Sequence, residues 1–146
     1  MTNDNKNLRL IDLCARLPYG VTIDVNGIRG HLRNMSVIHL YYDTDEVQDT
    51  ISEIDFFGDG DTISIERIKP YLRPMSSMTE EEKVALREFG VCDDYAFHND
   101  VYDVGTSMED AFDTISWLLK RHFDINHLIE KGLALEAPEG MYKIKQ

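Results

Sequence analysis

The clearest hydrophobic pattern in the chain is the alternation of apolar and polar residues over Val21–Val25. Such alternation places the apolar side chains on one face of a β-strand. Asn26-Gly27 follows directly, and this pair favours a two-residue type I′ turn, in which both positions need a positive φ. The sequence therefore predicts a hairpin with a fixed register: Val21 opposite Leu32, Thr22 opposite His31, Ile23 opposite Gly30, Asp24 opposite Arg29 and Val25 opposite Ile28.

The residues before this hairpin predict a short amphipathic helix over Leu8–Leu17, which Pro18 ends because proline disfavours helix continuation. Its expected apolar face consists of Leu10, Leu13, Cys14 and Leu17. We therefore expect this face to cover the core.

Three runs after the hairpin are rich in β-branched or aromatic residues and predict strands: Val37–Tyr42, Ser52–Phe57 and Thr62–Glu66. The last two are expected to form a second hairpin through the turn residues Gly58–Asp61. Asp43–Asp49 is too acidic to favour a strand. Two prolines, Pro70 and Pro74, lack backbone donors, so residues 67–78 are expected to form an ordered connector.

The second half of the chain has helical signals. Thr79 and Glu82 form a capping box that starts a helix, and Gly90 offers its end. Residues 91–104 lack a period and predict an irregular segment. Ser107 caps a longer helix with an apolar stripe of Met108, Ala111, Phe112, Ile115, Leu118 and Leu119. A last short helix is expected at residues 127–131, between Asn126 and Gly132.

These elements predict an α+β fold: an N-terminal helix and antiparallel sheet, mainly β over residues 1–75, then mainly helical residues 76–146. A length of 146 residues suits a single domain, residues 1–146. The two cysteines, Cys14 and Cys92, are too few for a disulfide framework, and we expect buried thiols in a reducing compartment. Neither a signal peptide nor a membrane span is visible, which favours a cytoplasmic protein.

The net charge of −12 is unevenly distributed, because two windows, residues 34–66 and 88–119, contain no Lys or Arg. Such acidic surfaces disfavour direct nucleic-acid binding, which needs clustered cations. One interpretation is a solvated surface that keeps the protein soluble. The other is a surface for a basic partner protein, for which we single out four aspartates: Asp93, Asp94, Asp100 and Asp103.

The concentrated positive feature is Arg67, Lys69 and Arg73 around Tyr71, which Arg29 and Arg33 of the first hairpin are positioned to join. A basic and aromatic group of this kind suits a nucleotide, with arginine forks on phosphate and tyrosine stacked on a base. The competing interpretation is that these cations neutralise nearby acids while Tyr71 anchors the connector to the core.

No catalytic residue, metal site or cofactor is predicted. The loop at Asp59 lacks the ligand spacing of an EF-hand, and the group Cys92–Asp100 lacks paired metal-ligand spacing. A nucleophile elbow and a phosphate-binding glycine loop are also missing from the sequence. An enzyme, specifically a hydrolase without a recognisable motif, stays as an alternative.

Two strings carry a resemblance: IKPYLRPMSSMTEEE at residues 68–82, and HFD with LIEKGLALEAP at residues 122–124 and 128–138. They resemble uncharacterised small proteins of gut bacteria and their phages or prophages, a group without a known activity. The resemblance implies a phage or prophage accessory factor. It covers roughly the last half of the chain.

We therefore expect a noncatalytic acidic binding protein that binds or inhibits a host protein. The alternative is a sponge that binds and sequesters a nucleotide-type signalling molecule and so counters host defence. Trp117, beside the helical stripe, leaves a homo-oligomer open as a further alternative.

Overall fold

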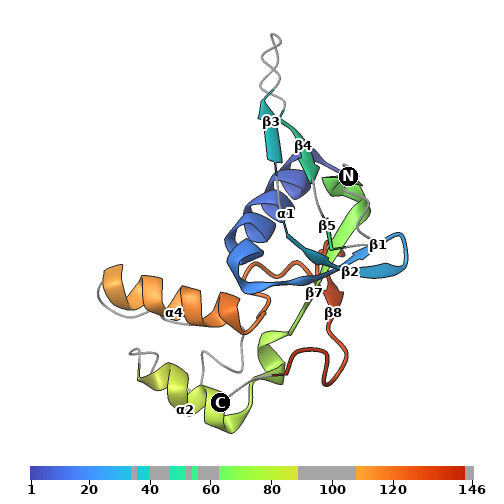
Figure 1. Cartoon of the computed structure of the whole chain (residues 1–146). Helices are drawn as coiled ribbons and strands as arrows, with labels where there is room; N and C mark the ends of the chain where they lie inside the picture. Colours follow the sequence, from blue (N-terminus) through green and yellow to red (C-terminus); the bar gives the residue numbers. More distant parts are fainter. Residues whose placement is uncertain (34–35, 40–46, 52–53, 56–62, 89–107, 144–146) are drawn as a thin grey trace. The chain divides into compact units, whose positions relative to one another are not determined.

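The computed structural model describes residues 1–33, 36–39, 47–51, 54–55, 63–88 and 108–143 (Figure 1). Its helices and mostly antiparallel sheets confirm the predicted α+β class. The chain divides into two compact units, one formed by Met1–Tyr71 with Leu128–Leu135 and the other by Leu72–His127 with Glu136–Gln146. Among the described helices, none has the length and apolar character needed to cross a membrane.

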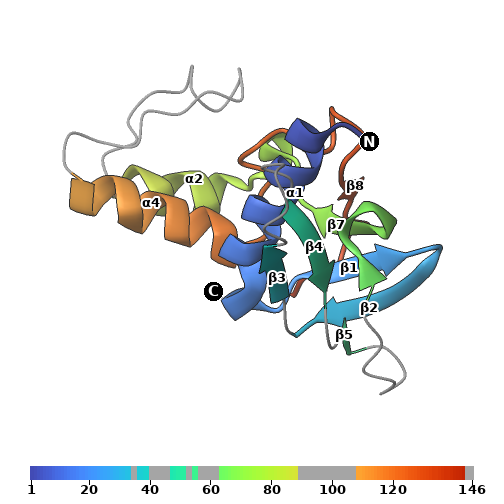
Figure 2. The ribbon, with the colours of Figure 1, turned by 90° about the horizontal axis from the view of Figure 1, so that it is seen from above.

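The first unit begins with α1 (Asn3–Arg16) and continues with seven strands, of which the last reaches the unit boundary: β1 (Thr22–Val25), β2 (Ile28–Leu32), β3 (Ser36–His39), β4 (Val47–Ile51), β5 (Ile54–Asp55), β6 (Ile63–Ser64) and β7 (Ile68–Leu72). Together with β8 (Leu135–Glu136) they form a five-stranded sheet of order β5-β2-β1-β7-β8 and a three-stranded sheet of order β3-β4-β6 (Figure 2).

The predicted first hairpin is confirmed, with Thr22 opposite His31, Asp24 opposite Arg29 and Val25 opposite Ile28. Asn26 and Gly27 both have the positive φ that the turn requires. The apolar face of β1 is buried, as the alternation predicts. On β2, however, Ile28 is 45% exposed, so the hairpin's tip contributes one side chain less to the core than expected.

The predicted helix is confirmed as α1, but only Leu13 of its expected apolar face is fully buried, and the other buried side chains of the helix are charged. The helix buries Arg9, Asp12, Leu13 and Arg16, whereas Cys14 is exposed, which also contradicts the expected buried thiol. Buried charge is tolerated here because each group has polar partners: Arg16 forms a bidentate ion pair with Asp12 at 2.6 and 3.0 Å, and both side chains are fully buried.

The second predicted hairpin is also wrong, because its two expected strands belong to different sheets. β5 pairs with β2, with Ile54 opposite Leu32, and β6 pairs with β4, with Ser64 opposite Thr50. Asp49, in the run that looked too acidic for a strand, lies in β4 opposite Val37. Strand pairing therefore overrides the local composition of this run.

The expected connector at residues 67–78 contains a strand, β7, which pairs with β1 and places Pro70 opposite Ile23. A proline removes only one ladder hydrogen bond, because each strand residue donates its N–H toward one neighbour. The remaining residues alternate, with Ile68, Pro70 and Leu72 buried between partly exposed neighbours. The two prolines argue against a strand, so this alternation does not predict one from the sequence alone.

The second unit contains α2 (Glu80–Arg87) and α4 (Met108–Lys120). The predicted capping box at α2 is confirmed, with both reciprocal hydrogen bonds between Thr79 and Glu82 present. The core of the second unit comprises Met75, Met78, Leu86, Leu118 and Phe123, and Trp117 and Ile125 pack against it. Phe112, assigned to the buried stripe of α4, is 72% exposed.

The predicted helix at residues 127–131 is wrong, because this stretch forms turns. His127 has a φ of 56°, which is incompatible with a helix start, and the Leu133 amide bonds back to the Leu128 carbonyl at 2.8 Å. Several other expectations lie outside the described residues: the end of the third strand, the turn 58–61, Gly90, Cys92, the segment 91–104 and the cap at Ser107.

Candidate functional site

In the five-stranded sheet, β2 and β7 lie on the two sides of β1, and each carries a cation on the outer face of the sheet. The register places Asp24 of β1 between Arg29 of β2 and Lys69 of β7. Tyr71 follows Lys69 by two residues and therefore shares its face of β7. Arg67, just before β7, lies beside the turn. With the Asn26 side-chain amide oriented so that its oxygen faces Arg67, that oxygen accepts hydrogen bonds from the Arg67 guanidinium. We call Arg29, Arg67, Lys69 and Tyr71 the basic sheet face.

The cations of the basic sheet face, Arg29, Arg67 and Lys69, form no ion pair with a carboxylate among the described side chains. Asp24, the acid between them, accepts a hydrogen bond from the Gly27 amide at 3.1 Å. The Arg29 guanidinium lies over the Tyr71 ring, 5.2 Å from its centroid, which combines a cation with an aromatic surface.

Two further residues of the predicted ligand site lie elsewhere in the chain. Arg33 is exposed just after β2. Arg73 belongs to the second unit, where its two terminal nitrogens grip Glu82 at 2.7 and 2.9 Å and its guanidinium covers the Phe123 ring at 4.2 Å. This bidentate pair satisfies the Arg73 side chain, so we leave Arg73 out of the candidate site.

Glu82 organises a second polar group, in the interior of the second unit. Besides Arg73, it lies 3.9 Å from Arg121, whose guanidinium stacks over the Trp117 ring at 4.1 Å. Burial by itself raises the pKa of Glu82, but hydrogen bonds from Arg73 and Thr79 outweigh burial and hold that pKa below its usual value. The sequence identified Glu82 as a cap but carried no signal for its arginine partners.

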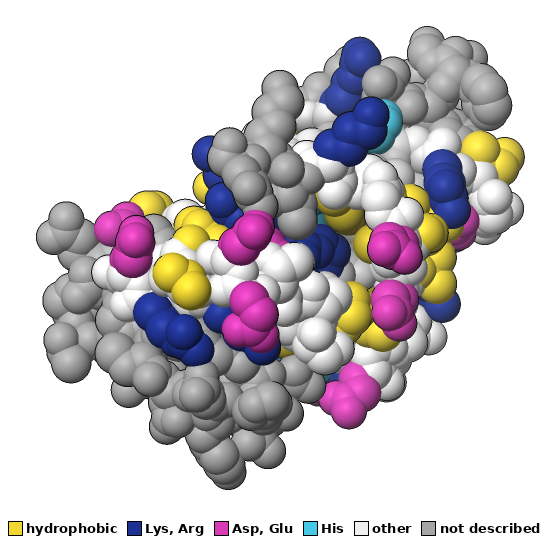
Figure 3. All heavy atoms as spheres, turned by 90° about the horizontal axis from the view of Figure 1, so that it is seen from below, with side chains coloured by type: hydrophobic (Ala, Val, Ile, Leu, Met, Phe, Trp, Pro, Cys, Tyr) yellow, Lys and Arg dark blue, Asp and Glu magenta, His cyan; other side chains and the backbone are white. Residues whose placement is uncertain are grey.

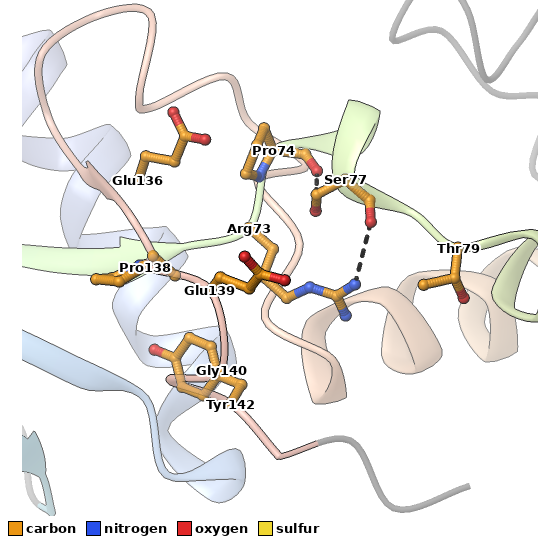
Figure 4. A pocket seen from close by; sticks show the side chains of 10 residues that line it. Arg73, Pro74, Ser77, Thr79, Glu136, Pro138, Glu139, Gly140 and Tyr142 are labelled. Carbon is orange, nitrogen blue, oxygen red and sulfur yellow. Dashed lines mark hydrogen bonds between the residues drawn. The ribbon is translucent and has the colours of Figure 1, made fainter.

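The second unit also contains a pocket of about 410 Å³ that sequence reasoning missed (Figure 4). One wall comes from residues 73–79 and the other from residues 136–142. The second wall carries Glu136, Glu139 and Tyr142, which lie after the last element predicted from the sequence. Their proximity to Ser77 depends on the fold, so no spacing in the sequence could reveal it.

The predicted partner surface, Asp93, Asp94, Asp100 and Asp103, lies outside the described residues. Nearly all of the 15 basic residues have described side chains, whereas only about half of the 27 acidic residues do. On the face shown in Figure 3, described acidic and basic side chains are interspersed. The excess negative charge of the chain therefore lies in acidic residues whose side chains the structure does not describe, some of them in β4, β5 and α4.

No protein family, curated protein or solved structure matches this chain. Within the described residues, no group of three or more His, Cys, Asp or Glu side chains is arranged to hold a metal ion. The basic sheet face and the pocket are therefore the two candidate sites of the described residues.

Proposed function

We propose that this chain is a noncatalytic binding protein that captures a phosphorylated, nucleotide-type ligand on the basic sheet face. The supporting observation is that Arg29 and Lys69 lie on either side of Asp24, that Arg67 lies beside Asn26 of the adjoining turn, and that no described carboxylate forms an ion pair with these cations. Arginine and lysine side chains donate strong, charge-assisted hydrogen bonds to phosphate oxygens. Capture alone, without turnover, would suit a phage-type accessory factor that sequesters a signal in the bacterial cytoplasm.

The aromatic residue gives this face a second means of recognition. Tyr71 is partly exposed, and the Arg29 guanidinium covers its ring. A base that stacked on this ring would displace the guanidinium. The displaced guanidinium would then be available to bind phosphate. Stacking of a base on an aromatic side chain contributes about 1–3 kcal/mol. We therefore expect nucleotides to bind more tightly than inorganic phosphate.

A thermal-shift panel of mononucleotides and cyclic dinucleotides tests this proposal. A ligand present at about 100 times its Kd should stabilise the protein by about 2.7 kcal/mol. The double variant R67A/K69A should lose that shift, because it removes two of the three cations. The matched control is Lys120→Ala, an exposed cation of α4, which should keep the shift. Equal shifts for both variants, or none with any nucleotide, would reject the proposal.

A second candidate function is binding of a basic host protein through the acidic segment that contains Asp93, Asp94, Asp100 and Asp103. The observation that favours it is that residues 88–119 hold eight acidic residues and no Lys or Arg. Electrostatic complementarity of this kind raises association rates and imposes strong salt dependence.

Affinity capture from a bacterial lysate, followed by biolayer interferometry on the recovered protein, tests this second function. Replacing all four aspartates by Asn should slow association at least about tenfold at low salt. A control with Asp113→Asn and Glu130→Gln, two exposed acids elsewhere in the chain, should bind normally. An unchanged association rate after the fourfold replacement would contradict this function.

A further inference from the structure

The pocket of the second unit presents two carboxylates that have no partner among the described residues. Glu136 and Glu139 are exposed on the C-terminal wall, and neither forms an ion pair or hydrogen bond within the described part of the chain. Figure 4 shows them on one segment and Ser77 and Thr79 on the other, with the Arg73 side chain between. Two unpaired anions beside a cavity create a local negative potential that favours a cation.

The cation already lining this pocket does not cancel that potential. Arg73 is held by Glu82 through two short hydrogen bonds of 2.7 and 2.9 Å, and Glu82 also lies 3.9 Å from Arg121, so its single charge is shared between two guanidiniums. Arg73 donates further to the Ser77 carbonyl at 3.5 Å, so its donors point at protein acceptors (Figure 4). The group of Arg73, Glu82 and Arg121 carries one surplus positive charge, and the two carboxylates of Glu136 and Glu139 leave negative charge in excess around the pocket.

The pocket also has an aromatic wall that is fixed in position. The Tyr142 ring stacks on His122, with 3.7 Å between the ring centroids and an angle of 16° between the ring planes. An aromatic ring that lines a pocket attracts organic cations through its quadrupole. The volume of about 410 Å³ lies within the range of pockets that hold small organic ligands, and is far larger than a metal ion requires.

We infer that this pocket binds an organic cation, a guanidinium or alkylammonium group, between the carboxylates of Glu136 and Glu139 and the ring of Tyr142. The inference does not depend on the proposed nucleotide site, because all residues of this pocket belong to the second unit. The same chemistry occurs in a free amine and in a Lys or Arg side chain of a partner protein.

An NMR titration of the ¹⁵N-labelled full chain with butylguanidinium tests the inference. The amides of residues 136–142, except Pro138, should shift in a saturable manner, and the neutral analogue N-butylacetamide should bind at least about fivefold more weakly. A peptide, acetyl-Gly-Arg-Gly-amide, distinguishes the sources: tighter binding than butylguanidinium indicates a partner's side chain, and weaker binding indicates a free cation. If neither cation shifts these amides, the inference fails.

The double variant E136Q/E139Q gives the decisive comparison. It keeps the shape of both exposed side chains and should raise the Kd for butylguanidinium at least about fivefold, as expected for the loss of two exposed ion pairs. The matched control is Glu130→Gln, because Glu130 is an exposed acid of the first unit with no partner among the described side chains, and this variant should leave the Kd unchanged. An unchanged Kd in the double variant, with its melting temperature retained, would overturn the inference.

Discussion

Replacing Arg9 by Ala is expected to lower the free energy of unfolding by about 3–4 kcal/mol. Arg9 is only 1% exposed, and it donates to three backbone carbonyls: Leu133 at 3.1 Å, Ile65 at 3.0 Å and Glu66 at 3.3 Å. Alanine would leave these acceptors without their donor and would open a cavity the size of the arginine side chain. Urea denaturation followed by far-UV circular dichroism measures the effect.

The expected loss at Arg9 is a balance of two opposing effects. Burial lowers the pKa of Arg9, which shows that holding this charge in the core is costly, although attraction to Glu66 partly offsets the cost. The carbonyls that it satisfies come from two segments far from α1 in sequence, so the side chain links three parts of the first unit. Removing it therefore affects more than the helix.

A control on the same helix separates this role from helix propensity. Lys6 has no described side-chain partner, so Lys6→Ala should change the free energy of unfolding by less than about 0.5 kcal/mol. The conservative variant Arg9→Lys should recover part of the loss, because it restores a cation but not the donor geometry. A loss at Arg9→Ala as small as that at Lys6→Ala would contradict this account.

The parts of the fold that could be predicted from the sequence are those that local chemistry determines. The first hairpin combines alternation with an Asn-Gly turn, and its register follows from that turn alone. The capping box of α2 is similar, because Thr79 and Glu82 are three residues apart and satisfy each other. Neither element needs a distant partner to be specified.

The errors occur where distant partners decide the outcome. The buried face of α1 is charged because carbonyls near residues 65 and 133 accept from Arg9, and no helical period can show this. Likewise, β7 is a strand because it pairs with β1, although Pro70 argues against a strand. In both cases long-range hydrogen bonding overrides the local propensity.

The candidate site could be predicted in part for the same reason. The register of the hairpin is enough to place Arg29 beside Asp24, whereas Lys69 and Tyr71 join this face only because β7 pairs with β1. Arg73 is close to them in sequence but serves the second unit, where Glu82 binds it. Proximity along the chain therefore overestimates the size of the site.

Replacing Glu82 by Gln is expected to lower the free energy of unfolding by about 3 kcal/mol at neutral pH. The Glu82 side chain is 8% exposed and the Arg73 side chain 11%, so the variant leaves a nearly buried guanidinium without its counter-charge. Gln can still bond the Thr79 amide, because capping boxes accept Gln at this position, so the loss reports mainly the ion pair.

Glu80→Gln is the matched control, since Glu80 lies in the same helical turn and also forms an ion pair. Its bond to Lys83, 3.1 Å long, is on the surface, where the Glu80 side chain is 84% exposed. Exposed pairs of this kind contribute at most about 0.5 kcal/mol. Similar losses at Glu80 and Glu82 would show that helix-terminus charge, and not the pair with Arg73, determines the stability.

The pH dependence of the Glu82→Gln effect gives an independent measurement. The pKa of Glu82 in the folded chain lies below its ordinary value of 4.5, because hydrogen bonds and charge from Arg73, together with Thr79, outweigh burial, which acts to raise it. The carboxylate therefore stabilises the fold fully above about pH 4.5, and this stabilisation is lost as the pH falls through the folded pKa. Urea denaturation from pH 7 to pH 3 should show a constant difference between the two proteins down to about pH 5, and a narrowing difference below about pH 4.5. A difference that widens on acidification would mean that the folded pKa of Glu82 is raised, so that burial and not Arg73 dominates its environment.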